Sequence, residues 1–104
     1  PHVVNAFAGI MCTAHIKLKN KECVESVIKT YKKFYEGSFT KILESVPCTK
    51  EVVHTPYCKI GGFKMDEQGI VIIAVLDNLM KGAASQAIEN MNLMFNKNQF
   101  EGLL

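Results

Sequence analysis

Arginine and tryptophan are both absent from this sequence of 104 residues, and all twelve basic residues are lysines. Arginine is the side chain whose planar fork binds a carboxylate or phosphate through two parallel hydrogen bonds. An anion would therefore have to be bound by lysine, by backbone N–H groups or by another chain segment. The longest apolar run, Ile70–Leu76, is far shorter than the roughly 20 residues of a transmembrane helix. The sequence thus predicts no membrane span.

Metal-ligand and disulfide patterns are missing as well. The cysteines show no CxxC spacing and no signal-peptide pattern is visible, so we expect neither a zinc site nor a disulfide framework. The formal net charge of +2 is close to neutral, which argues against nucleic acid or an anionic membrane as a partner. We expect most of the cysteines to be small core residues; they are Cys12, Cys23, Cys48 and Cys58.

The residues that are present suffice for one domain with a hydrophobic core, since 48% of them are hydrophobic. The sequence starts abruptly at Pro1-His2-Val3-Val4, without an initiator methionine. This start predicts a domain excised from a longer chain, although processing or removal of a tag would look the same.

Hydrophobic periodicity predicts the order strand, helix, strand, strand, strand, helix. Residues 9–18 alternate with period two, so they should form a half-buried strand with Ile10, Cys12, Ala14, Ile16 and Leu18 on its buried face. The other expected elements are a helix at 22–36, a short strand at 39–43, an irregular segment at 44–55, a strand at 57–65 with a bulge at Gly61-Gly62, a central strand at 70–76, and a helix at about 79–95 with a tail.

This order predicts an α+β fold, with a mixed, mostly antiparallel sheet and helices on one face. The strand at 70–76 has no polar position, so both of its faces should be covered, by this chain or by another subunit. The last helix should bury an apolar face made by Met80, Ala83, Ala84, Ala87, Ile88, Met91, Met94 and Phe95.

The start of that last helix carries two residues that a helix tolerates poorly. Lys81 places a positive charge at the positive end of the helix dipole, and Gly82 costs about 1 kcal/mol relative to alanine. A helix start can also bind anions and amides. From the residues alone, Asn78 is a candidate N-cap and Gly82 a candidate packing contact.

The stretch LDNLMKGAASQAIENMNLMF, residues 76–95, resembles the C-terminal signature of N-acetyl-gamma-glutamyl-phosphate reductase. That family reads close to LDNL-x-KGA-[AS]-GQA-x-QNMN-[LI]-M, so Ser85 replaces a usual Gly and Glu89 a usual Gln. PHVVNAFAGIMCTAHIKL, KKFYE and TKEVVHTPYCKIGGFKMDEQGIVIIAV are similar to other family segments in the same order. The similarity covers essentially the whole chain.

The resemblance implies an oxidoreductase of arginine biosynthesis that reduces an acyl phosphate to an aldehyde with NADPH. Residues 1–104 would be part of its C-terminal catalytic and dimerisation domain, which is similar to that of glyceraldehyde-3-phosphate dehydrogenase. Residues 78–104 would be the helix and tail that return toward a missing dinucleotide-binding domain. This sequence has no GxGxxG, and the family's nucleophile and histidine motifs are absent. The piece alone should therefore be inactive.

The same resemblance assigns candidate site residues. Asn78 would meet the nicotinamide carboxamide of NADP, Gly82 would let the cofactor approach the backbone, and Lys81 would lie near a phosphate. His2 would line the site. The family's arginine before Gly-Ile is replaced by Ala8, which removes one holder of an anionic substrate group. No catalytic residue and no metal ligand is expected on this chain.

The resemblance further implies a homo-oligomer that acts on a small molecule in the cytoplasm, or in an organelle such as the mitochondrion in a eukaryote. The alternative is a stand-alone α+β binding or dimerisation module without catalysis. A lysine-pathway, carrier-linked substrate is as compatible with the residues as the arginine-pathway one. Three further residues are expected to have plain structural or solvent-exposed roles, namely His15, Lys50 and His54, with a pairing of His54 and Cys58 as the less favoured reading.

Overall fold

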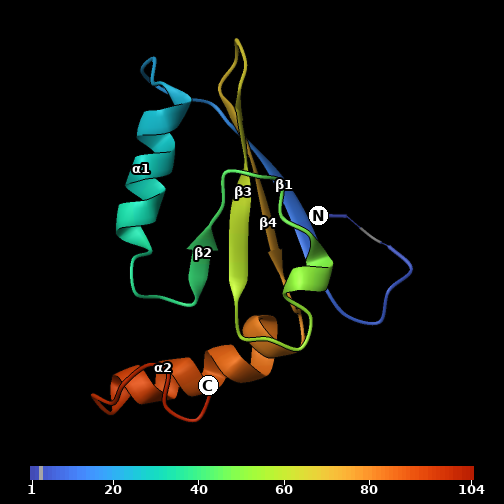
Figure 1. Ribbon diagram of the computed structural model, residues 1–104, viewed down its shortest axis with the longest axis vertical. Coiled ribbons are helices and arrows are strands. Elements are labelled where there is room, and N and C mark those ends of the chain that lie inside the picture. Colours follow the sequence, from blue (N-terminus) through green and yellow to red (C-terminus); the bar gives the residue numbers. More distant parts are fainter. Residues whose placement is uncertain (3) are drawn as a thin grey trace.

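The described part of the chain forms four strands, two α-helices and two short helical turns (Figure 1). The computed structural model describes residues 1–2 and 4–104. The helical elements are α1 (Val24–Phe34), a short 3-10 turn η1 (Thr49–Glu51), a π-helical turn η2 (Met80–Ala84) and, directly after it, α2 (Ser85–Met94).

The strands form one mixed sheet in the order β1-β4-β3-β2. β1 (Ile10–Ile16) and β3 (Cys58–Met65) both pair antiparallel with β4 (Ile70–Leu76). β2 (Thr40–Ile42) pairs parallel with β3. The predicted α+β class with a mixed, mostly antiparallel sheet is thereby confirmed.

The bulge predicted at Gly61-Gly62 is present in β3. The register with β4 shifts between Gly61 and Lys64, and Gly62 has a φ of 63°. A Cβ on Gly61 would collide with the backbone carbonyl oxygen of Ser45. Glycine is therefore required here because the segment between β2 and η1 passes directly over the strand.

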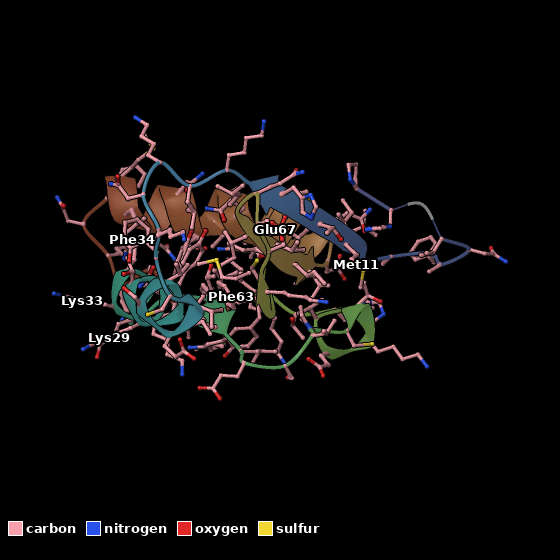
Figure 2. The ribbon with its side chains drawn as sticks, turned by 90° about the horizontal axis from the view of Figure 1, so that it is seen from above. Met11, Lys29, Lys33, Phe34, Phe63 and Glu67 are labelled. Atoms are coloured by element: carbon pink, nitrogen blue, oxygen red, sulfur yellow. The ribbon has the colours of Figure 1, made fainter. Side chains whose placement is uncertain are left out.

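The sheet is covered by different material on its two faces. Figure 2 shows α1 on one side of the sheet and the η1 segment on the other. The ring of Tyr31 in α1 packs edge-on against Phe63 of β3, with 5.3 Å between the ring centroids. On the opposite face, the side chains of Val46 and Ile73 both lie next to Gly62. We call these two sides the helix face and the loop face.

Because both faces of the sheet are covered, β4 has buried residues on each of its faces. Ile70 and Ile72 are buried, and so is Val75, which alternation places on the other face. The sequence-based prediction that strand 70–76 is covered on both faces therefore holds for these residues within this chain.

The buried face predicted for the first strand is wrong for this chain alone. Ile10 and Ile16 are 40% and 39% exposed, and Cys12 is exposed between them. α1 contacts β2 and β3, at the other end of the sheet from β1. The prediction of core cysteines also fails, because Cys12, Cys23 and Cys48 are exposed and Cys58 is half-buried.

The face of the last helix that this chain buries is polar, whereas the prediction expected its apolar face to be buried. Its buried residues are Ser85, Glu89 and Asn92, whereas Met91, Met94 and Phe95 on its expected apolar face are 50%, 81% and 70% exposed. Asn92 explains part of this inversion, since its Nδ2 donates to the carbonyl oxygens of Gln99 and Glu101 in the tail. The polar face of α2 packs against the rest of this chain, whereas its apolar face is exposed.

Candidate functional site at the start of the second helix

Asp77, the residue between β4 and the helix, is the polar centre of this region. It is 1% exposed. Its Oδ1 accepts hydrogen bonds from the backbone N–H groups of Leu79, at 2.7 Å, and Met80, at 3.1 Å. Its Oδ2 accepts one from the backbone N–H of His54, also at 2.7 Å. Asp77 therefore caps the helix, the role predicted for Asn78, and it also ties the loop before β3 to the helix start.

The carboxyl of Asp77 is held in its ionised form mainly by backbone N–H groups. Burial acts to raise its pKa, but the backbone hydrogen bonds from His54, Leu79 and Met80, with a further Coulombic contribution from His54, outweigh burial, and the net pKa is lowered. The negative charge also lies at the positive end of the helix dipole. Asp77 is thus a fixed anion at neutral pH.

Asn78 joins the helix start to the entry of β1. Its Oδ1 accepts a hydrogen bond of 2.9 Å from the backbone N–H of Gly9, 69 residues away in the chain. The atom that faces an N–H donor must be the amide oxygen, so the Nδ2 side of the amide is the side that can donate to a ligand. The side chain is therefore oriented by its own fold, as a positioned amide should be.

Gly82 lies in a π-helical turn. The N–H of Gly82 bonds the carbonyl of Asp77, and the N–H of Ala84 bonds that of Leu79, both five residues back. A Cβ on Gly82 would meet only ordinary contacts, 3.4 Å from the Leu76 side chain. Packing within this chain therefore does not require glycine here, which weakens the packing alternative. Single π turns inside helices are frequent at functional sites.

Lys81 points toward this chain's own interior. Its Nζ lies 2.6 Å from Oε2 of Glu89, with side chains only 12% and 9% exposed. The same Nζ lies 5.5 Å from the ring centroid of Phe39. Glu89, which the sequence analysis did not single out, explains why a lysine is tolerated in the first turn of this helix.

The structure places His2 beside β1. Its backbone bridges Met11, and its Nε2 is hydrogen-bonded to the Thr13 hydroxyl at 2.8 Å. Asn78 contacts Gly9, the residue before β1. His2 is thus placed along the strand, whereas Asn78, Lys81 and Gly82 come together on the helix start.

The remaining candidates show no catalytic arrangement. His15, Lys50 and His54 are exposed. Burial raises the pKa of the Cys58 thiol more than the nearby charge of Lys81 lowers it, so this thiol is a weak nucleophile at neutral pH. Within residues 1–2 and 4–104, no group of three or more His, Cys, Asp or Glu is placed to hold a metal ion.

Comparison with known proteins shows the family of this chain. The family model described as the semialdehyde dehydrogenase dimerisation domain matches residues 1–78. The chain belongs to this family. The match ends at Asn78, so it includes the whole sheet and the helix cap but not the helix itself.

Relatives similar over 98–99% of the chain include proteins named N-acetyl-gamma-glutamyl-phosphate reductase. The protein of Methanocaldococcus jannaschii is 45% identical over 99% of this chain. That of Halothermothrix orenii is 44% identical over 99%, and that of Geobacillus stearothermophilus 40% identical over 98%. This chain spans 31% of the length of each. The resemblance read from the sequence is confirmed.

Membership of a dimerisation-domain family supports assembly of this chain with other copies. In the described part of the chain, no helix has the length and apolar character needed to cross a membrane.

Proposed function

We propose that this chain is the C-terminal catalytic and dimerisation part of an NADP-dependent N-acetyl-gamma-glutamyl-phosphate reductase. The supporting observation is the identity of 40–45% to reductases of that name over 98–99% of the chain. The reaction would convert the acyl phosphate, NADPH and a proton into N-acetylglutamate semialdehyde, inorganic phosphate and NADP⁺. Because the chain lacks a dinucleotide fingerprint and the family's nucleophile motif, the piece alone would be inactive.

The helix start fits a nicotinamide dinucleotide on chemical grounds. The Nδ2 group of Asn78 is an oriented donor for a carboxamide oxygen, since Gly9 occupies the oxygen of the same amide. The surface at Gly82 is exposed and free of a side chain. When bound, NADPH supplies the hydride; the role of this chain is to orient the nicotinamide end. Lys81 would contribute only the part of its charge that Glu89 leaves uncompensated.

The exposed apolar side of α2 supports the proposed domain arrangement. Ile88, Met91, Met94 and Phe95 face outward, while the polar side of the same helix binds this chain. We propose that residues 78–104 return toward a dinucleotide-binding domain and dock on it through this apolar side. The location of the enzyme in the cytoplasm, or in an organelle of a eukaryote, remains a prediction.

The test uses the full-length gene product. We expect it to catalyse phosphate-dependent reduction of NADP⁺ with N-acetylglutamate semialdehyde, the reverse reaction. Asn78→Asp replaces the donor with an acceptor, so the KM for the cofactor should rise at least about tenfold, equivalent to about 1.4 kcal/mol. Asn90→Asp, the same change at an exposed position of α2, is the matched control. Equal kinetics of the two variants would remove Asn78 from the cofactor site.

The second candidate function is a binding or dimerisation module without chemistry. Two observations favour it: Ala8 stands where the family has an arginine, and the charge of Lys81 is already paired. Absence of any semialdehyde-dependent NADP⁺ reduction by the full-length protein, with its fold and assembly intact, would favour this module over the reductase.

A further inference from the structure

β1 is the edge strand at one end of the sheet order β1-β4-β3-β2. It pairs with β4 through seven consecutive residue pairs, and among residues 1–2 and 4–104 its other side is met by no further strand, only by the single bridge from His2. Edges of this length are usually protected by proline, lysine or a bulge. The strand sequence, IMCTAHI, has no proline or lysine, and its pairing with β4 shows no register shift. Such an edge is expected to be covered in the native protein.

His2, near the N-terminus, already contacts the free edge of β1. The backbone N–H of His2 donates to the carbonyl of Met11 at 3.0 Å, in an antiparallel bridge. His2 Nε2 is hydrogen-bonded to the Thr13 hydroxyl, two residues further along β1. Figure 1 shows the N-terminus beside β1. The chain thus enters the structure already aligned with the free edge.

The direction of the backbone groups on β1 follows from this bridge. The carbonyl of Met11 points to the free edge, and in a strand the direction alternates with period two. The N–H and C=O groups of Thr13 and His15 therefore point to the free edge as well. Those of Cys12 and Ala14 point to β4.

We propose that the segment immediately before Pro1 in the native protein continues this bridge as a fifth strand, antiparallel to β1. The register of His2 with Met11 sets the residue immediately before Pro1 opposite Thr13, and the second residue before Pro1 opposite Ala14. The nitrogen of Pro1 faces away from β1 in this register, where a proline is accepted on an edge strand.

The proposal rests on the proposed function only in that this chain is part of a longer protein, as its 31% share of its relatives indicates. A second copy of β1 is a poorer occupant of the edge, because His2 already holds the carbonyl of Met11. The upstream segment needs no displacement of that contact.

Amide hydrogen exchange of the full-length protein tests the pairing. We expect the amides of Thr13 and His15 to exchange at least about tenfold more slowly than unprotected amides, as do those of Cys12 and Ala14. Fast exchange at Thr13 and His15, with slow exchange at Cys12 and Ala14, would mean a bare edge and overturn the proposal. Reductase activity measured on the same sample tests the proposed function separately from the fifth strand. An active enzyme with fast exchange at Thr13 and His15 would reject the fifth strand alone.

A disulfide trap identifies the occupant. In a Cys12→Ser background, Ala14→Cys is combined with a cysteine at the second residue before Pro1, a non-hydrogen-bonded pair whose Cα atoms lie about 4.5 Å apart. We expect a bond within one chain on a non-reducing gel. The control moves the upstream cysteine one residue closer to Pro1, where its side chain faces the other side of the sheet. Bonding between chains only, or equally with the control, would reject the upstream strand.

Discussion

Asp77 is the central polar residue of the candidate site. It was not predicted because the sequence does not show which distant segment its carboxylate contacts. A carboxylate before a helix is an ordinary cap, but its third donor, the N–H of His54, lies in another segment. The bond between Asn78 and Gly9 spans 69 positions and is equally invisible in the sequence. Lys81 and Glu89 did carry a signal, because positions 81, 85 and 89 share one helix face.

Asp77→Asn should destabilise the folded protein. The amide keeps an oxygen for two donors but turns an N–H₂ group toward the third, which we expect to cost about 1–3 kcal/mol. Because folding lowers the pKa of Asp77, its stabilisation is complete above the unfolded pKa of about 3.9 and is lost as the pH falls through the folded value. Urea unfolding should therefore show a gap between wild type and variant at pH 7 that narrows progressively as the pH falls below about 4.

The control for this prediction is Asp66→Asn. Asp66, like Asp77, accepts hydrogen bonds from backbone N–H groups. It has two such donors, Gln68 and Gly69, and lies in an exposed turn. Its replacement should cost clearly less than that of Asp77. A gap of the same size for both variants, or one that persists unchanged at acid pH, would contradict the account of Asp77.

Gly82→Ala separates stability from cofactor binding. A Cβ at this position meets no close contact in this chain, so the substitution should raise the free energy of unfolding by about 0.5–1 kcal/mol through helix propensity. If the cofactor approaches the backbone here, the KM for NADPH should rise several-fold in the same variant. Thermal unfolding and steady-state kinetics of the full-length enzyme measure the two effects. A stabilised variant with an unchanged KM would leave Gly82 without a cofactor role.

At the scale of elements, periodicity located the four strands and two α-helices of the described residues, though not the 3-10 turn η1, and it misjudged which faces this chain covers. Period two identified the apolar row of β1, and helical spacing identified the apolar stripe of α2. Both are exposed here. A hydrophobic pattern indicates that a face is buried in the native protein. It does not indicate which polypeptide segment covers that face. The pairing of β1 with β4 is likewise set by tertiary structure, because the partners lie 54 to 66 positions apart in the chain.

The outward face of α2 gives the prediction at this scale. Met91→Lys places a charge where we expect contact with the dinucleotide domain, so full-length protein should lose about 1.5–3 kcal/mol of stabilisation from a buried apolar side chain. Asn90→Lys, on an exposed neighbouring position, is the control. Thermal unfolding together with limited proteolysis between the domains measures the loss. Equal stability of the two variants would show that this face of α2 remains in water.

At the scale of the whole molecule, the helix face of β1 is the surface best suited to a second copy of the chain. Alternation and the register with β4 place Ile10, Cys12, Ala14 and Ile16 on the same face as Ile72. The family is one of dimerisation domains, and an uncovered apolar row on a central sheet is the kind of surface that a stable oligomer buries.

Ile16→Lys should therefore shift the full-length protein toward monomers. A lysine in an apolar contact leaves its charge without water or a partner, which is costly. His15→Lys makes a similar change one residue earlier, on the opposite and exposed face, and should leave the assembly intact. Light scattering over a range of protein concentrations measures the mass of both variants. If Ile16→Lys and His15→Lys assemble alike, the copies meet elsewhere and the row on β1 must be covered by another part of the same chain.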